Sequence, residues 1–125
     1  MFAAEAHSHR YAGATLVPGQ GNNLFVFLAI GMALYATKAK RVTDEIFVAA
    51  AQAVAECVTS ADLDLRQIFP PQSEISETEL HVATRIAEVI FERGLSDLQK
   101  PDDIAGLFAS KSTFRTIGVW CRRVA

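Results

Sequence analysis

The sequence predicts a mainly α-helical chain of about four helices, preceded by a short irregular or strand-containing stretch. Three observations support this fold class. Apolar residues recur at spacings of three and four along several segments, as on the buried face of a helix. Residues that favour helix starts and ends bound those segments. No convincing series of segments alternates apolar and polar residues, as strands would. At 125 residues, the chain is a single domain or a fragment.

The first part of the chain, residues 1–23, is expected to be irregular or extended. Pro18 favours an extended backbone at the residue before it, and Gly19 and Gly21 follow closely. A short strand is expected near residues 13–17.

The first helix is predicted from about Asn23 to Lys38. The run 24–36 carries no charge and is apolar nearly all round, which is typical of a fully buried helix. Asn22 and Asn23 precede the run. Asparagine is a good N-cap because its side-chain oxygen accepts a hydrogen bond from an early, unpaired backbone N–H.

The second helix is predicted to start after Thr43, as its N-cap, and to run to about Val58. The acidic pair 44–45 falls in the first turn, where the helix dipole favours negative charge. Val42 and Phe47 have the spacing of a hydrophobic staple. The expected apolar face consists of Ile46, Phe47, Ala50, Val54, Cys57 and Val58.

Residues 59–75 are predicted to be a connection. Pro70 and Pro71 lack backbone donors and stop any helix there. Ile68 and Phe69, just before them, are expected to anchor this loop on the core.

The third helix is predicted over residues 77–93. Ser76 and Glu79 have the spacing of a capping box, and Ile75 with Leu80 can form a staple around it.

Gly94 is expected to end that helix, because glycine adopts the left-handed conformation without a Cβ clash. A last helix is expected to begin near residues 101–103 and to carry Ile104, Leu107 and Phe108.

Charge and cysteine content exclude several classes of function. The net charge is −2, from 12 basic and 14 acidic residues, so a nucleic-acid partner is not expected.

The run 24–36 is too short for a membrane span, which needs about 20 residues. Membrane association through that run is a weaker alternative. Cys57 and Cys121 lack the spacing of a zinc site, and a reduced cytoplasmic protein is the simplest interpretation.

The stretch Gly19 to Asn23 is the main candidate for chemistry. It does not match a GxGxxG phosphate loop, because Leu24 occupies the third glycine position. The carboxamides of Asn22 and Asn23 both donate and accept hydrogen bonds. They therefore suit a substrate carboxylate or hydroxyl, or a nicotinamide carboxamide. A Gly/Asn turn with an asparagine cap is the structural alternative.

Histidines and carboxylates give no further site. His7 and His9 lie in a polar segment without the additional ligands that a metal requires, and His81 is expected at a surface or boundary position. No pair of carboxylates has to be an acid–base couple. No catalytic or metal-binding residue is therefore predicted.

Four segments, in one order along the chain, resemble malic enzymes. They cover roughly residues 13–108 in one register. In order they are Val17-Pro18-Gly19-Gln20-Gly21-Asn22-Asn23 before an apolar helix, the helix start Arg41-Val42-Thr43-Asp44-Glu45-Ile46-Phe47, the loop Ile68-Phe69-Pro70-Pro71, and the late helix with Thr84-Arg85-Ile86-Ala87 and Phe91-Glu92-Arg93-Gly94-Leu95.

The resemblance implies a fold and a chemistry. Malic enzymes oxidise malate with NAD or NADP and decarboxylate the product to pyruvate, using Mg²⁺ or Mn²⁺. By resemblance, residues 1–23 are the end of the cofactor domain, and residues 24–125 are C-terminal helices. Asn22 and Asn23 match the family's paired asparagines, which line the active site near malate and the nicotinamide.

The chain also departs from the family. Phe27-Leu28-Ala29-Ile30 stands where the family usually has a Phe-Pro-Gly step, and residues 112–125 do not follow the usual ending. The catalytic lysine and tyrosine, the metal-binding carboxylates and the dinucleotide glycine loop of the family lie upstream of the matched part. The isolated chain is therefore expected to be inactive and to bind neither cofactor nor metal tightly.

Two kinds of partner follow from this interpretation. The helices are expected to pack against the missing upstream domains or to self-associate as a homo-oligomer, which would account for a mean hydropathy of +0.20. The alternative function is a non-catalytic helical interaction module that remains after loss of the catalytic domains.

Overall fold

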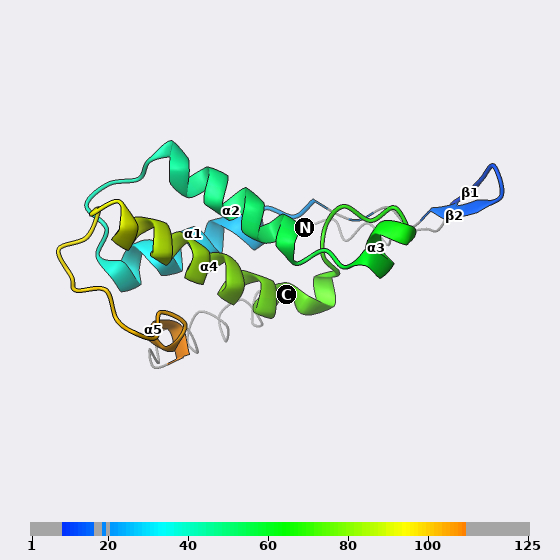
Figure 1. The fold of residues 1–125 in the computed structure, drawn as a ribbon. Helices are drawn as coiled ribbons and strands as arrows, with labels where there is room; N and C mark the ends of the chain where they lie inside the picture. Colours follow the sequence, from blue (N-terminus) through cyan, green and yellow to red (C-terminus); the bar gives the residue numbers. More distant parts are fainter. Residues whose placement is uncertain (1–8, 17–18, 20, 110–125) are drawn as a thin grey trace, which may run out of the picture.

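The computed structural model describes residues 9–16, 19 and 21–109, and it confirms the mainly helical fold class (Figure 1). A β-hairpin precedes the helices. The helical elements are α1 (Leu24–Thr37), α2 (Asp44–Glu56), α3 (Ser60–Asp64), the 3₁₀ helix η1 (Gln72–Glu74), α4 (Ile75–Glu92) and α5 (Gly106–Ala109).

The core is formed by α1, α2 and α4, and α4 packs against both of the others (Figure 1). Four small residues of α1 and α4, Ala29, Ala33, Ala83 and Ala87, are fully buried in this core. Larger buried side chains fill the rest of the core; they are Phe25, Ile30, Ile46, Val54, Val82, Ile86 and Ile90.

The ends of α1 and α4 lie together, so these two helices run in the same direction. The Lys40 N–H donates to the Leu95 carbonyl at 2.9 Å, and the Ser96 hydroxyl donates to the Thr37 carbonyl at 2.5 Å. α2 runs the opposite way, because its start pairs with the end of α4 and its end pairs with the start of α4. Those two contacts are Glu45–Arg93 at 3.1 Å and Glu56–His81 at 2.9 Å.

Gly94 ends α4 as predicted. Its φ is +62°, its N–H donates to the Phe91 carbonyl, and the Leu95 N–H donates to the Ile90 carbonyl. These two bonds together form a Schellman motif. Lys38 has the same left-handed conformation after α1, with φ of 51°.

The hairpin consists of β1 (His9–Tyr11) and β2 (Ala14–Leu16), paired antiparallel with Arg10 opposite Thr15. It extends away from the helical body (Figure 1). β2 confirms the strand expected near 13–17, whereas β1 was not predicted. The turn between the strands has positive φ at Ala12 and Gly13, which matches the right-handed twist of a tight hairpin.

The prediction that α1 is fully buried is wrong. Phe27 is 68% exposed and Tyr35 is 62% exposed, on the side of α1 that faces away from α4. The apolar pattern does not show which side of α1 is covered, and α2 and α4 pack on only one side of it.

The start of α2 after Thr43 is confirmed, but two details of the prediction are wrong. The Thr43 side chain makes no capping bond, and its buried Oγ1 has no hydrogen-bond partner among the described residues. Phe47, which was expected on the apolar face, is 50% exposed and lies on the outer side of α2.

The predicted capping box at Ser76 is also wrong. α4 begins at Ile75, directly after η1, and Ser76 lies inside its first turn without a side-chain cap. The reason is the turn after Pro71, whose carbonyl accepts a hydrogen bond from the Glu74 N–H at 3.0 Å. This turn starts the helical path earlier than the capping pattern suggests.

The connection 59–75 contains a helix that was not predicted, α3. Its start has a complete capping box, because Asp62 Oδ2 accepts from the Thr59 N–H at 2.9 Å and the Asp62 N–H donates to Thr59 Oγ1 at 3.2 Å. Phe69 packs against the core as expected, but Ile68 is 69% exposed and anchors nothing.

The last helix is confirmed with a later start, at Gly106, so it carries Leu107 and Phe108 but not Ile104. Asp103 Oδ1 accepts a hydrogen bond from the Gly106 N–H at 2.9 Å, and both Ile104 and Phe108 are buried. No helix in the described part of the chain is long and apolar enough to cross a membrane.

Candidate functional site

Gly19 and residues 21–23, here called the asparagine loop, precede α1, and residues 21–23 lead directly into it. Asn22 Oδ1 accepts a hydrogen bond from the Leu24 N–H at 3.0 Å, and the Asn22 carbonyl accepts from the Phe25 N–H at 3.2 Å. Asn23 already has helical backbone angles, and its side chain makes no capping bond. Asn22 therefore caps the start of α1, and Asn23 does not.

The backbone donors of the first turn of α1 are all used. Leu24 and Phe25 donate to Asn22, while the N–H groups of Val26 and Phe27 both donate to the Asn23 carbonyl. A ligand at this helix start would therefore meet side-chain groups rather than free backbone N–H groups. Among the described residues, the groups that remain at this helix start are the amide nitrogen of the half-buried Asn22 and the carboxamide of the exposed Asn23.

Phe69 supports the asparagine loop from a distant part of the sequence. A β-carbon placed on Gly21 would lie 3.2 Å from both Cε2 and Cζ of the Phe69 ring. A β-carbon on Gly19 would lie 3.5 Å from the Phe69 backbone nitrogen. Two segments that carry the resemblance thus pack on each other. The sequence offered one signal for this contact, since closely spaced glycines often mark a close backbone approach.

The other candidate side chains do not join this loop. The side chains of His7 and His9 and all of Cys121 lie outside the described residues. His81 lies at a boundary position as expected, with its Nε2 2.9 Å from Glu56 Oε2. Burial raises the pKa of the Cys57 thiol, although a hydrogen bond with Thr78 acts in the opposite direction. The thiol therefore stays protonated and is a poor nucleophile.

One carboxyl group has an unusual environment that the sequence did not reveal. Burial raises the pKa of Glu79, in the second turn of α4, to about 6. The pattern of residues alone cannot predict this shift, because it depends on how the neighbouring elements remove water from the carboxyl group.

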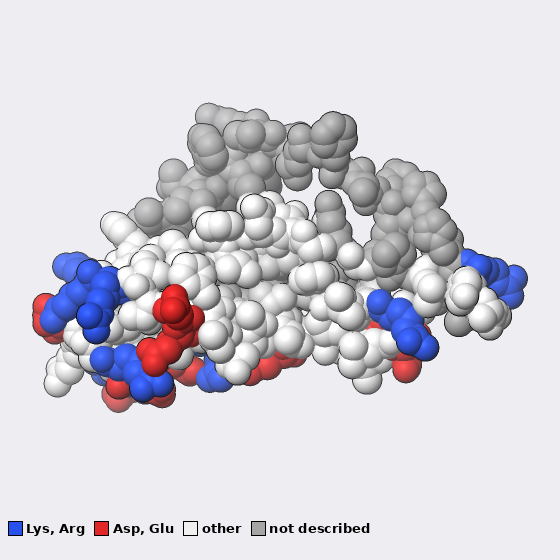
Figure 2. Space-filling model, turned by 90° about the horizontal axis from the view of Figure 1, so that it is seen from above, with Lys and Arg blue, Asp and Glu red and all other residues white. Residues whose placement is uncertain are grey.

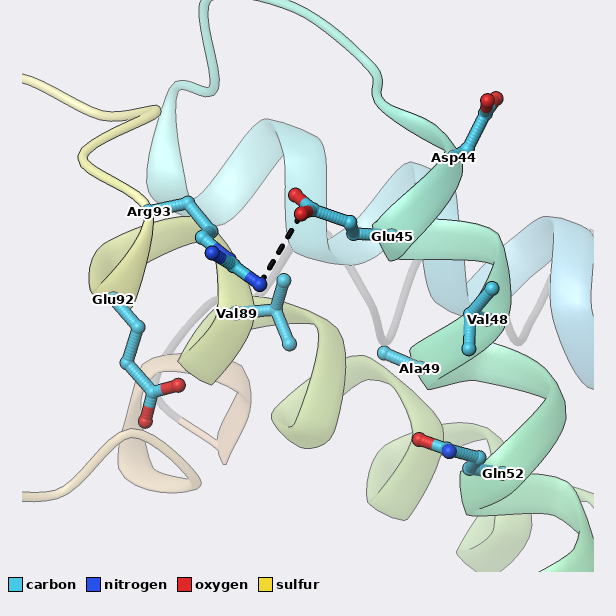
Figure 3. A pocket seen from close by; sticks show the side chains of 8 residues that line it. All are labelled: Asp44, Glu45, Val48, Ala49, Gln52, Val89, Glu92 and Arg93. Atoms are coloured by element: carbon cyan, nitrogen blue, oxygen red, sulfur yellow. Dashed lines mark ion pairs between the residues drawn. The ribbon is translucent and has the colours of Figure 1, made fainter.

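A hollow of about 330 Å³ lies between α2 and α4 (Figure 3). Its apolar part is formed by Val48, Ala49 and Val89, and Asp44, Glu45 and Glu92 contribute three carboxylates. The guanidinium of Arg93, the single cation that lines it, is 3.1 Å from Glu45. This balance of charge repels a dicarboxylate. The hollow is therefore a poor candidate for a malate site.

The outer face of α2 carries no charge between its two ends. Its exposed residues are Phe47, Val48, Ala51, Gln52 and Ala55. In the view from above, the charged side chains gather toward the ends and one edge of the described surface, and much of its middle is uncharged (Figure 2). Such a face is typical of a surface that packs against other protein.

The described residues do not fit a metal site, since no group of three or more His, Cys, Asp or Glu side chains among them could hold a metal ion. A site for Mg²⁺ or Mn²⁺ usually needs carboxylate oxygens at close range.

A family model described as "Malic enzyme, NAD binding domain" matches residues 5–91. The matched part includes the asparagine loop, α1, α2, Phe69 and nearly all of α4. The chain belongs to the malic enzyme family.

Individual malic enzymes give the same result. The chain is 36% identical over 101 residues to the NADP-dependent malic enzyme of Dictyostelium discoideum and 40% identical over 95 residues to that of Vitis vinifera. It is 31% identical over 93 residues to the mitochondrial NAD-dependent malic enzyme of Ascaris suum. These alignments cover 81%, 75% and 74% of this chain.

The chain corresponds to a small part of each relative. The alignments span 19%, 16% and 14% of the lengths of these three malic enzymes. Both NAD- and NADP-dependent enzymes are among the relatives, so the similarity establishes the family and no preference for one nucleotide.

Proposed function

We propose that this chain supplies the asparagine loop and the C-terminal helices of a malic enzyme, which oxidises and decarboxylates malate to pyruvate with NAD or NADP. The observation that carries the proposal is the geometry of the loop. The side-chain oxygen of Asn22 accepts a hydrogen bond from the Leu24 N–H. This bond fixes the direction in which the amide nitrogen of Asn22 can donate. Asn23 is exposed at the start of α1, so both the oxygen and the nitrogen of its carboxamide are available to a ligand.

These two groups would bind and orient the reactants. The Asn22 amide nitrogen can donate to a carboxylate oxygen of malate. The Asn23 carboxamide can donate to and accept from the malate hydroxyl or the nicotinamide carboxamide. NAD or NADP, when bound, would accept the hydride. The described residues do not fit the Mg²⁺ or Mn²⁺ of the family, so in this proposal the ligands of the metal come from other parts of a malic enzyme.

We further propose that the isolated chain is inactive and that it is cytoplasmic. Its partner in this proposal is either the upstream domains or a second copy of the chain. It also treats residues 1–23 as the end of the cofactor domain and 24–125 as the helices that cover it. The exposed apolar side chains of α1 and α2 support a covered surface.

The first test is reduced-nicotinamide formation by the pure chain with malate, Mn²⁺ and NAD or NADP. We expect no turnover. The chain is then combined with an upstream malic enzyme part that lacks the equivalent segment, and we expect activity to return. A saturable rate from the chain alone would contradict the proposal.

Variants of the loop sharpen that test. Asn23→Ala in the reconstituted enzyme is expected to lower kcat/KM by about tenfold or more, the usual effect of losing a hydrogen bond to a substrate group. Gln99→Ala removes an exposed carboxamide from the segment between α4 and α5 and is the matched control. An equal effect of both substitutions would contradict a specific role for the loop.

The alternative is a non-catalytic helical interaction module. The uncharged outer face of α2 favours it, because that face needs a partner whether or not an active site is completed. If no upstream part restores activity while the chain still assembles with another protein through α2, the alternative holds.

A further inference from the structure

The position of Phe69 is fixed on two sides. The side chain is partly buried and packs against the core, and the next residue, Pro70, is buried. On its other side the ring lies over Gly21. Phe69 therefore connects the asparagine loop to the helical core through a segment that follows α3.

Gly21 is not required for its backbone conformation. Its φ lies outside the left-handed region, unlike those of Gly13 and Gly94. An alanine could adopt this backbone, but its β-carbon would lie 3.2 Å from two ring atoms of Phe69. A side chain at this position therefore fits only if the Phe69 ring gives way by a few tenths of an ångström.

Gly19 provides an internal comparison. The three atoms nearest to a β-carbon there would be the nitrogen, Cβ and carbonyl oxygen of Phe69, at 3.5 to 3.6 Å. These are ordinary contacts, and none of them involves the aromatic ring. All three atoms would also remain if Phe69 were replaced by alanine.

We propose that Phe69 is a positioning residue, whose ring sets the place of Asn22 and Asn23 by packing on Gly21. Gly21 directly precedes Asn22, and Asn22 holds the Leu24 N–H through its side chain. A shift of Gly21 therefore moves the cap of α1 and the amide nitrogen offered to a ligand. The contact exists in this chain alone, whereas its catalytic consequence rests on the proposed function.

Hydrogen–deuterium exchange of the Leu24 amide in the full chain tests the contact without any activity. Phe69→Leu keeps an apolar side chain but loses the ring, and it should speed Leu24 exchange on the order of tenfold. Amides in the middle of α4 should exchange at the wild-type rate, because a local change of the loop leaves the core folded. Ile68→Ala, at the exposed neighbouring position, should leave Leu24 exchange unchanged.

A double-mutant cycle identifies the ring as the cause. Gly21→Ala should speed Leu24 exchange in the presence of Phe69, and much less in a Phe69→Leu background. The Gly19→Ala substitution should have the same small effect in both backgrounds. Equal effects of Gly21→Ala in both backgrounds, or faster exchange spread over all amides in Phe69→Leu, would overturn the proposal.

Kinetics of the reconstituted enzyme separate this inference from the proposed function. If both this inference and the proposed function hold, Phe69→Leu should change kcat/KM without reducing assembly of the two parts. Ile68→Ala should leave kcat/KM unchanged. The effects of Gly21→Ala and Phe69→Leu on Leu24 exchange could prove coupled while no activity is restored. That result would support the positioning contact and contradict only the malic enzyme proposal.

Discussion

The hydroxyl of Ser96 donates a hydrogen bond to the backbone carbonyl of Thr37, 2.5 Å away, and so joins the segment after α4 to the last residue of α1. Thr37 is fully buried, and its carbonyl lies at a helix end where no further turn of α1 can satisfy it. The Ser96 side chain thus takes the place of a backbone donor.

Ser96→Ala should lower the free energy of unfolding by about 1 to 2 kcal/mol, because a partly buried carbonyl loses its hydrogen-bond donor. Urea unfolding measures the loss. Ser73→Ala, at an exposed position in η1, should change stability by much less. If Ser96→Ala lowered the free energy of unfolding no more than Ser73→Ala does, water would replace the Ser96 hydroxyl as the donor to the Thr37 carbonyl.

Two glycine-to-alanine substitutions should have opposite signs. Gly94→Ala should destabilise the protein by about 1 kcal/mol, since φ of +62° is strained for a side chain although no atom lies within 4 Å of its β-carbon. Gly31→Ala, within α1 and equally free of neighbours, should stabilise it by up to about 1 kcal/mol. Thermal unfolding of both variants measures the difference, and a shared sign would contradict this account.

Glu79 should make stability depend on pH. Its pKa is raised from 4.5 to about 6 in the folded chain, so the folded state holds a proton that the unfolded state releases. Stability should therefore fall as the pH rises from 4.5 to 6 and stay lower above that window.

Glu79→Gln should remove this dependence. Well above pH 6 it should raise the free energy of unfolding by about 1 kcal/mol, after allowance for screening by solvent at a half-buried site. Well below 4.5 it should have little effect. Denaturant unfolding at both extremes tests this, with Glu77→Gln, exposed in the same helix, as the control. A gain of the same size at both extremes would contradict the role of ionisation.

The exposed apolar side chains of α1 and α2 should cause self-association of the isolated chain. Phe27→Lys combined with Phe47→Lys should shift sedimentation toward the monomer. Ile68→Lys changes an equally exposed side chain in the loop before Pro70 and should leave association unchanged. A wild-type chain that stays monomeric at high concentration would contradict the expected interface.

The sequence predicts the helices of the core because their signals are local. The apolar spacing of α4, the left-handed end at Gly94 and the acidic first turn of α2 each depend on neighbouring residues only. The exposed side of α1 could not be predicted, since its run is apolar on every side and only the packing decides which side is covered.

The position of the two asparagines at the start of α1 was predicted for the same reason. Asn22 and Asn23 were recognisable because they are adjacent and precede a helix. The support of their loop by Phe69 was not, because α1, α2 and α3 separate the two segments along the chain and the contact depends on how these elements pack. The start of α4 was misplaced because the turn after Pro71 competes with the capping pattern at Ser76.

The order of Gly21 and Phe69 along the chain also bears on biosynthesis. During translation both asparagines leave the ribosome well before the aromatic ring that holds their loop, and all of α1, α2 and α3 must be made in between. The loop therefore acquires its support late. A nascent chain or proteolytic product that ends at Gln67 would carry both asparagines without the ring beneath them, and would have lost the geometry of the site while keeping its residues.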